Sequence, residues 1–272
     1  MTGWTLSLRQ RPTLRLDLRG LRPSALAGLS AAELAALPLG HGREPVALGD
    51  CFAVNPRADG ALVFEGDLSR CDRVGWQLDG GTLRVAGPVG DHAGGAMRAG
   101  ELLIEGDARD LVGCEMAGGR LEVRGHVGDF AAGNLPGSMD GMRGGLLLVR
   151  GHAGARFGDR MRRGTALVFG DAGDFLASRL VAGTIAVGGR VGRHLGYGLR
   201  RGSVVLAGPP PQIPSTYVPA VAEAPVFWQL LARDLARLGG PGSAFAGLPQ
   251  RRIRRHLGDL AAGGQGELIL PD

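Results

Sequence analysis

The chain contains no lysine; all 31 of its basic residues are arginines. This absence excludes the phosphate-binding lysine of a P-loop and the Schiff-base lysine of pyridoxal enzymes. Cysteine is scarce, and Cys51, Cys71 and Cys114 are odd in number and widely spaced. They predict neither a disulfide framework nor an iron–sulfur or zinc ligand set. Three tryptophans, two tyrosines and eight phenylalanines are the only aromatic residues, so we expect an aliphatic core.

Long hydrophobic runs are missing as well. No apolar stretch reaches the ~18–20 residues that would span a bilayer. Residues 1–8 show no charged region followed by an apolar stretch, which a secretion signal would require. We therefore expect a soluble, cytoplasmic protein that does not contact membranes.

Glycine, in contrast, is present in excess. The 272 residues include 49 glycines and 16 prolines, and the formal net charge is +5. This share of glycine and proline approaches the ~25–30 % that is typical of low-complexity disorder in chains without a period. A hydrophobic content of 44 % argues against disorder. A regular repeat would decide in favour of a folded protein.

A repeat of 19 residues fills the middle of the chain. One glycine ends each short apolar run, and these closing glycines are 21, 19, 19, 26, 19, 19 and 19 residues apart: Gly66, Gly87, Gly106, Gly125, Gly151, Gly170, Gly189 and Gly208. A second, leading glycine stands six residues before each of them: Gly60, Gly81, Gly100, Gly119, Gly145, Gly164, Gly183 and Gly202. At this glycine frequency such a coincidence would arise about once in a million trials, so the repeat is real.

Side chains alternate between the paired glycines. The position four residues before the closing glycine is always aliphatic: Leu62, Leu83, Leu102, Leu121, Leu147, Ala166, Ile185 and Val204. The position two residues before it is apolar too: Phe64, Val85, Ile104, Val123, Val149, Val168, Val187 and Leu206. A period of two with β-branched enrichment predicts strands with one buried face. We expect the closing glycine to take a positive φ and form a tight corner.

Nineteen residues are too few for a strand, a packed helix and two connections. They do fit several short strands joined by corners, so that successive coils stack at the ~4.8 Å strand spacing. The sequence therefore predicts an all-β protein, a right-handed parallel β-helix of about eight coils.

The ends of the chain differ in composition from the repeat, as expected for caps over exposed strand edges. Residues 4–9 and 13–20 alternate like two strands, and Ser30 with Glu33 predicts a capping box for a short helix that Pro38 ends. Residues 46–54 match a degenerate first coil. We expect an N-terminal cap at residues 1–45, the β-helix at 46–208, and a linker with a helical docking tail at 209–272. Within that tail, residues 225–238 predict an amphipathic helix.

Repeated polar and sulfur-containing residues are candidates for chemistry, but each has a structural explanation. Four methionines share a column nine residues before the closing glycine, where other coils carry leucine: Met97, Met116, Met142 and Met161. A thioether ladder could bind a soft metal, but the leucines favour core packing. Aspartates recur after the closing glycine at positions typical of turns, where Asp bonds its own backbone: Asp67, Asp107, Asp171, Asp91, Asp110, Asp129 and Asp174.

The histidines follow the same logic. His126 and His152 come directly after closing glycines, whereas His92 and His194 come five residues after them and lie five coils apart. A metal site needs converging ligands, so solvated corner positions are favoured over a metal site. The sequence contains no G-x-S-x-G, H-E-x-x-H or C-x-x-C motif. We predict no catalytic, cofactor-binding or metal-binding residue in this chain.

Two local features are not explained by the repeat and are candidate partner contacts. The 26-residue spacing places an insertion in one corner: Asn134, Leu135, Pro136, Gly137, Ser138, Met139 and Asp140. A loop on a solenoid flank either touches a partner or substrate or is merely tolerated. Near the C-terminus stand Arg251, Arg252, Arg254 and Arg255. They suit an acidic partner surface or a polyanionic coenzyme, or they form an ordinary solvated face. Scarce aromatics disfavour nucleic acid.

The register G-x-L-x-V-x-G-x-V-G-x-x-x-G, found at residues 80–94, 144–158 and 183–196, resembles a known glycine-rich β-helix domain. This domain occurs in the C subunit of formylmethanofuran dehydrogenase and at the C-terminus of the glutamate synthase large subunit. Residues 18–42 and 256–270 are similar to the flanks of the dehydrogenase C subunit, so the resemblance covers nearly the whole chain. A glutamate synthase chain would also carry glutaminase and flavin domains, for which there is no room.

The resemblance implies one of two settings. In archaea, the C subunit belongs to a tungsten or molybdenum dehydrogenase that reduces carbon dioxide onto methanofuran. In methylotrophic bacteria, the similar subunit belongs to a formyltransferase/hydrolase complex, which moves formyl from tetrahydromethanopterin to a methanofuran analogue and hydrolyses it to formate. Abundant Ala, Arg and Gly without lysine indicate a GC-rich genome and favour the bacterial setting.

In both settings the metal, zinc or else tungsten or molybdenum, and the catalytic residues belong to other subunits. The resemblance thus implies a non-catalytic scaffold that is an obligate partner of those subunits and binds neither nucleic acid nor membrane. The alternatives are the C subunit of the tungsten or molybdenum enzyme, a stand-alone subunit of the glutamate synthase type, and a self-sufficient β-helix enzyme with a groove.

Overall fold

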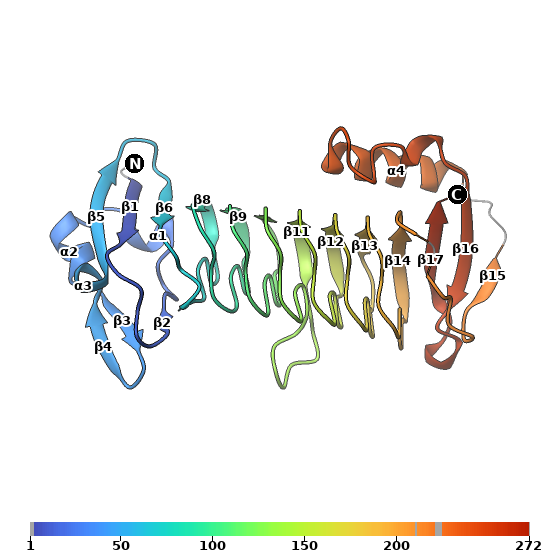
Figure 1. Ribbon diagram of the computed structural model, residues 1–272, viewed down its shortest axis with the longest axis horizontal. Coiled ribbons are helices and arrows are strands. Elements are labelled where there is room, and N and C mark those ends of the chain that lie inside the picture. The colour runs from blue at the N-terminus through green and yellow to red at the C-terminus, as the bar shows by residue number, and fades with distance from the viewer. Residues whose placement is uncertain (1–2, 210, 221–224, 272) are drawn as a thin grey trace.

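The computed structural model describes residues 3–209, 211–220 and 225–271. The molecule is elongated, with the described N-terminal residues at one end of a row of strands and the C-terminal strands at the other (Figure 1). Thirteen strands form one mostly parallel sheet along this row, and four short strands form a second sheet at the N-terminal end.

The repeats form the middle of the large sheet. Eight strands are hydrogen-bonded neighbours in chain order and parallel: β6 (Leu62–Glu65), β8 (Asp79–Val85), β9 (Ala99–Ile104), β10 (Arg120–Val123), β11 (Arg143–Val149), β12 (Arg163–Val168), β13 (Thr184–Val187) and β14 (Arg201–Leu206). The predicted columns are the pairing register, since Leu83 pairs with Leu102 and Leu121 with Leu147. The expectation of a mostly β, mostly parallel fold resembling a β-helix is confirmed.

A second ladder connects the coils beyond the closing glycines. Single parallel bridges join the position two residues after each closing glycine to its equivalent in the next coil: Leu68, Val89, Ala108, Val127, Ala153, Ala172 and Val191. Each repeat therefore bonds to its neighbours at two separate places.

The remaining side of each coil consists of turns in which alternate residues are left-handed. In one coil, His92, Gly94 and Ala96 have φ values of 63°, 65° and 51°. The amides of His92 and Ala96 donate to carbonyls of the next coil, each at 2.8 Å, and that of Gly94 donates to Val74 of the preceding coil. This backbone is satisfied by its neighbours. The sequence did not indicate it, because bulky residues such as Phe130 and Phe175 also occupy the left-handed positions.

The two glycine columns serve different physical needs. All eight leading glycines have positive φ, from 72° at Gly60 to 108° at Gly183. Among the closing glycines only Gly66 has a positive φ. The expectation that closing glycines form tight corners with a positive φ is therefore wrong for the other seven. A Cβ at Gly87 would lie 2.3 Å from the carbonyl oxygen of Gly66. The closing glycines are needed because neighbouring coils touch there backbone to backbone.

The inward columns form one continuous aliphatic core. Met97, Met116, Met142 and Met161 are fully buried in it, which confirms that the methionines pack the core. Cys71 and Cys114 are buried too, and burial raises the pKa of both thiols to about 12.

A second apolar layer covers the outward face of the last strands. Leu148, Leu167, Ala186 and Val205 point away from the main core, yet they are buried in a separate cluster. Helix α4 (Pro225–Gly239) contributes Trp228, Ala232 and Leu235 to that cluster, joined by Phe245 and Leu248 of the following segment. The helix lies alongside the late strands (Figure 1). The prediction of one buried face is therefore wrong for β11 to β14, which are covered on both.

The N-terminal cap begins with a strand of the ladder. β1 (Gly3–Leu8) runs parallel to β6 and antiparallel to β5 (Phe52–Arg57). The small sheet contains β2 (Leu16–Asp17), β3 (Pro38–His41), β4 (Glu44–Ala47) and β7 (Cys71–Asp72), beside the short helices α1 (Pro23–Leu26), α2 (Ala31–Ala35) and α3 (Leu48–Cys51). The Ser30–Glu33 capping box of α2 is confirmed. The degenerate coil at 46–54 is wrong, because β4, α3 and antiparallel β5 occupy it.

The C-terminal strands extend the ladder. β17 (Gln265–Pro271) is parallel to β14, with Leu268 opposite Val204, and β16 (Ile253–Gly258) and β15 (Val218–Ala220) follow it antiparallel. Two 3-10 helices, η1 (Leu248–Gln250) and η2 (Leu260–Ala262), flank β16. Residues 225–239 are helical as expected, but the expectation of a helical tail is wrong for residues 253–258 and 265–271. A strand completes the row because the last coil would otherwise expose an unpaired edge.

The close approach of the coils predicts a large difference between two glycine substitutions. Gly145 in β11 has φ +86°, and a Cβ there would lie 2.7 Å from Met116 Cε and 2.8 Å from the backbone of Gly118. Gly137 has φ +83° with nothing within 4 Å. We expect Gly145→Ala to lower the free energy of unfolding by about 2–5 kcal/mol and Gly137→Ala by about 1–2 kcal/mol, measured by urea denaturation. Equal losses would contradict the backbone contact.

Candidate functional site

Side-chain acceptors on the corners hold neighbouring coils together. In the position directly after the closing glycine, Asp107 Oδ1 accepts the amide of His126 at 2.7 Å, and His126 Nδ1 accepts that of His152 at 2.9 Å. His152 Nδ1 then accepts the amide of Asp171 at 2.8 Å, and Asp171 Oδ1 accepts that of Arg190 at 2.7 Å. Each side chain thus binds the equivalent amide one coil further along.

A parallel row runs through the position four residues after the closing glycine. Asp91, Asp110, Asp129 and Asp174 accept amides of the next coil through Oδ1, over distances of 2.7 to 3.4 Å. Asp72, six residues after Gly66, accepts the amide of Asp91 in the same way at 2.8 Å. Among the column members only Asp67 bonds its own turn, through the amide of Ser69 at 3.0 Å. The expected own-backbone bonding is therefore wrong for most of these aspartates. They connect coils, and a carboxylate loaded with such a bond is poorly placed to act as a general base.

The two neighbouring histidines are acceptors as well. The rings of His126 and His152 stack with centroids 4.9 Å apart and planes 4° apart. Because each Nδ1 accepts an amide hydrogen, the neutral rings carry their proton on Nε2. The other pair does not meet. His92 packs edge-on against Trp76, and burial lowers its pKa, while His194 stacks on Phe175. Within the described ranges, no group of three or more His, Cys, Asp or Glu could hold a metal ion.

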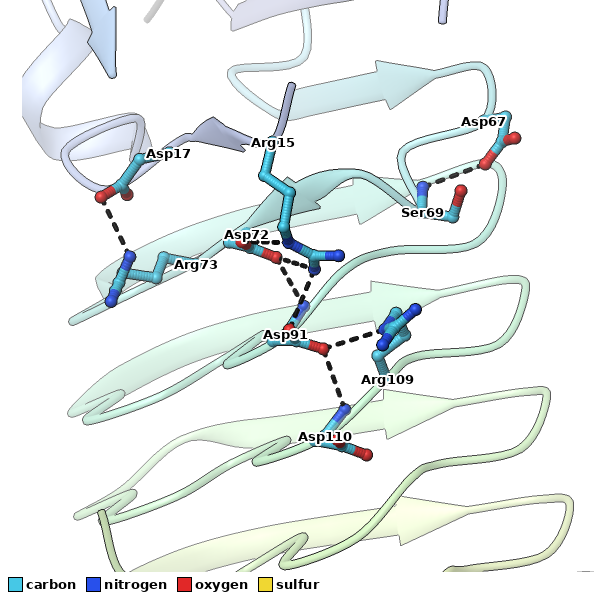
Figure 2. A network of polar contacts seen from close by, with 9 residues as sticks. All are labelled: Arg15, Asp17, Asp67, Ser69, Asp72, Arg73, Asp91, Arg109 and Asp110. Carbon is cyan, nitrogen blue, oxygen red and sulfur yellow. Dashed lines mark hydrogen bonds and ion pairs between the residues drawn. The ribbon is translucent and has the colours of Figure 1, made fainter. Parts of the chain in front are cut away.

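A network of arginines and aspartates joins the N-terminal cap to the first coils (Figure 2). Arg15 donates from Nε to Asp72 Oδ2 at 2.7 Å, and its Nη2 contacts Asp72 Oδ1 and, at 3.0 Å, Asp91 Oδ2. Arg109 of the next coil donates to Asp91 Oδ1 at 3.1 Å. These four side chains connect the cap to three successive coils.

Asp17 forms a second branch of this network. It accepts a bond from Arg73 Nη1 at 3.0 Å and bonds from the backbone and side chain of Arg19. Burial by itself would raise the pKa of Asp17. The hydrogen bonds from Arg19 and the charge of Arg73 outweigh that cost, so the pKa lies below its ordinary value.

The predicted insertion is an ordered loop that projects from the stack before β11 (Figure 1). Asn134 Nδ2 donates to the carbonyls of Leu135 and Ser138 at 3.0 and 2.8 Å, which closes the loop on itself. Asp140 forms an ion pair with Arg162 of the next coil. Pro136, Gly137 and Met139 are exposed.

The predicted C-terminal arginine cluster is divided by the strand that carries it. Arg255 pairs with Glu267 Oε2 at 2.8 Å, and Arg251 Nη1 donates to the carbonyl of Ala207 at 3.2 Å. Both side chains are half-buried, whereas Arg252 and Arg254 are exposed. The structure therefore does not gather all four into one exposed patch.

Sequence reasoning missed a different group of arginines. Arg143, Arg162, Arg163 and Arg201, from three coils, line an open groove of about 380 Å³ whose remaining lining is Val181 and Ala182. We call these six residues the arginine groove. A second depression of about 340 Å³ continues from it through Val181 and Arg201. The sequence did contain a signal for this group: in several coils an arginine comes directly after the methionine or leucine that stands nine residues before the closing glycine.

Another open cleft, of about 460 Å³, lies against the linker. Asp174, Arg193 and His194 line it on the coil side, and Pro211, Gln212 and Pro214 on the linker side. Separately, no helix of the described residues is long and apolar enough to cross a membrane.

Several known proteins are similar to this chain. A family model described as the GXGXG motif matches residues 56–219. The C subunit of the formyltransferase/hydrolase complex Fhc of Methylorubrum extorquens is 44% identical over 86 residues, 32% of each chain. The C subunit of the tungsten-containing formylmethanofuran dehydrogenase 2 of Methanothermobacter thermautotrophicus is 30% identical over 99 residues, 35% of this chain and 37% of the relative. These alignments span about a third of the relatives' length.

A solved structure matches over almost the entire length. It is the crystal structure of the formyltransferase/hydrolase complex FhcABCD from Methylorubrum extorquens in complex with methylofuran. The matching chain is 41% identical, the match covers 98% of this chain and 99% of that one, and the TM-score is 0.91.

The acceptor rows predict that Asp129 acts through its oxygen atom and not through its charge. Asp129 Oδ1 accepts the amide of Ala155 at 2.7 Å. We expect Asp129→Ala to lower the free energy of unfolding by about 1–2 kcal/mol, because an amide between coils loses its acceptor. Asp129→Asn keeps an Oδ1 acceptor and should stay within about 0.5 kcal/mol of the wild type. Chemical denaturation measures both variants, and equal destabilisation would show that the charge matters instead.

The lowered pKa of Asp17 predicts a pH-dependent contribution of the N-terminal cap. A carboxyl whose pKa is lower in the folded than in the unfolded state stabilises the folded protein at pH values above its unfolded pKa, here 3.8. This contribution is lost as the pH falls through the pKa of the folded state. We expect Asp17→Asn to cost about 0.5–1 kcal/mol at neutral pH, as for a solvent-screened ion pair, and less near pH 3. Urea unfolding at several pH values measures this. Asp50→Asn, an exposed carboxylate of the same cap, is the control. A constant cost for Asp17→Asn would contradict the role of the ion pairs.

Proposed function

The chain belongs to the GXGXG motif family, and from this premise we propose that it is the C subunit of a formyltransferase/hydrolase complex. The observation that carries the proposal is the full-length match, at 41% identity and a TM-score of 0.91, to a chain of the FhcABCD complex. The complex would move formyl from tetrahydromethanopterin to a methanofuran-type carrier and hydrolyse it to formate. The chain's partners would be the other subunits.

Within that complex we assign the chain a non-catalytic, scaffolding role. The residues best suited to chemistry support this assignment, since Asp110, Asp129, His126 and His152 use their acceptor atoms to bind amides of the next coil. The metal and the carrier-binding residues would belong to other subunits. Methylofuran in the matching complex supports a carrier of the methanofuran type.

Rigidity is the physical property that such a role requires. Every coil is bonded to the next at the strands, at the single bridges, at the left-handed turns and at the acceptor rows. We propose that the repeats up to residue 208 form a right-handed β-helix of about eight coils, between an N-terminal cap and a C-terminal unit at 209–272. Because β4, α3 and β5 occupy residues 44–57, this cap extends beyond the expected bounds of 1–45. A stiff column would hold catalytic subunits at constant separation while a carrier-bound formyl group passes between their sites.

The candidate partner contacts remain those on the outside of this column. The exposed residues of the insertion, Pro136, Gly137 and Met139, project from the flank, and Arg252 and Arg254 are exposed at the C-terminal end. We place the complex in the cytoplasm. A subunit of a tungsten or molybdenum formylmethanofuran dehydrogenase is the second candidate, supported by 30% identity over 99 residues.

The scaffold role predicts that the isolated chain is inactive. The purified chain and the complex co-expressed with its other subunits are assayed for hydrolysis of a formylated methanofuran-type carrier, with formate as the readout. We expect turnover in the complex and none in the chain alone, because the chemistry resides elsewhere. A Met161→Asp variant, whose buried charge should prevent folding, controls for contaminating activity.

Two further outcomes would contradict the proposal. Formate release by the isolated chain, absent in the Met161→Asp preparation, would make the chain an enzyme. A tagged chain that recovers no other subunit from its own cell extract would exclude the complex. Metal analysis of the recovered complex distinguishes the candidates, because tungsten or molybdenum would favour the dehydrogenase.

A further inference from the structure

The arginine groove combines positive charge from three separate coils. Arg143 begins β11, Arg163 begins β12 and Arg201 begins β14, while Arg162 directly precedes β12. All four side chains are exposed. They lie together because the 19-residue period places the same corner of successive coils on one line.

This positive charge is only partly compensated within the chain. Arg162 pairs with Asp140, and Arg201 Nε donates to Gln265 Oε1 at 2.9 Å, an uncharged partner. Among the described residues, no ion pair involves Arg143 or Arg163. No carboxylate lines the groove itself.

The arrangement is unfavourable for the isolated chain. Arg143 and Arg163 are register partners on adjacent parallel strands, and like charges directly opposite one another destabilise a sheet. Other arginines of the chain avoid this situation: Arg120 and Arg150 share Glu122, and Arg84 and Arg124 share Glu105. A bound anion would relieve the repulsion at the groove.

The shape of the groove indicates an extended ligand. The coil between β12 and β14 contributes the uncharged residues Val181 and Ala182 to the lining, whereas the coils on both sides of it contribute arginines. The second depression extends the surface past Arg200 and Arg201 to Gln265. A row of this kind suits a chain of anions better than one small ion.

Carboxylates are the anions that fit best. A guanidinium group binds a carboxylate through two parallel hydrogen bonds, which accounts for arginine here. Neither depression is lined by an aromatic side chain on which a nucleic-acid base could stack. We propose that the arginine groove binds an acidic segment, a run of Asp and Glu side chains, of a partner subunit. This inference rests on the proposed function, which supplies the partner.

The insertion loop adjoins the same surface. Asp140, the last residue of the insertion, pairs with Arg162 of the groove, and Met139 beside it is 63% exposed. A partner segment seated on the arginines would therefore also reach the insertion where Asp140 contacts Arg162. This contact gives the insertion a role that the groove alone does not.

The test uses the complex with a tagged chain carrying Arg163→Glu and Arg201→Glu. We expect the affinity for the other subunits to fall at least about tenfold, because two charge-assisted contacts become repulsive. The wild-type affinity should decrease between about 0.1 M and about 0.5 M salt, and that of the variant should change less.

Arg98→Glu is the matched control, since Arg98 occupies the same corner of an early coil, is exposed and lies outside the groove.

Folding is monitored separately by thermal unfolding. Replacing Arg163 removes a like-charge pair, so we expect a melting temperature at or above that of the wild type. If the double Glu variant does not fold, Arg163→Gln with Arg201→Gln carries the same test with a smaller expected loss.

The outcomes separate this inference from the proposed function. In one outcome the wild-type chain recovers the other subunits, and the folded double variant binds them with unchanged affinity and salt dependence. This result would overturn the proposed acidic-segment site in the groove but would leave the proposed scaffold function standing. Normal assembly combined with lost binding of a single-stranded oligonucleotide or of inorganic phosphate would also overturn it, because the groove would then serve another anion. Failure of the wild type to recover any subunit would overturn the proposed function.

Discussion

Direct contact between the backbones of successive coils is the constraint on which this structure depends. Strands stack at hydrogen-bonding distance, and at the closing glycines a single Cβ would collide with the preceding coil, as at Gly87. Only glycine permits that approach, so an excess of glycine stiffens this molecule instead of loosening it. The leading glycines solve a different problem, the positive φ needed where each strand begins.

Polar side chains are used for the same purpose. Asp110, Asp129, His126 and His152 resemble candidates for acid–base or metal chemistry, yet each accepts an amide from the next coil. At the N-terminal end Arg15 extends this bonding into the cap through Asp72 and Asp91. A molecule built this way is suited to holding other subunits in place. Arg143 and Arg163, which are register partners on adjacent strands, both line one groove on its surface.

Much of the fold could be predicted because it is periodic. The parallel ladder, the buried methionine column and the α2 capping box follow from spacing, since a repeat places equivalent residues in register. The ends could not be predicted in the same way. β1 and β17 lie outside the repeat, yet each pairs with a terminal strand of the parallel row, and β5 pairs antiparallel with β1. The unpaired edge of a sheet can accept such strands whether or not they belong to the repeat.

By itself the sequence determined the period, the columns and the family resemblance, because these are properties of residue order. Tertiary structure decided what covers the column and which charges remain on its surface. The outward leucines of β11 and β12 are buried only because α4 packs on them, and Arg251 and Arg255 are engaged only because β16 and β17 pair. Arg143, Arg163 and Arg201 are far apart in the chain. Coiling brings Arg163 and Arg201, which are two periods of 19 residues apart, to the same corner, and Arg143 joins them there as the register partner of Arg163.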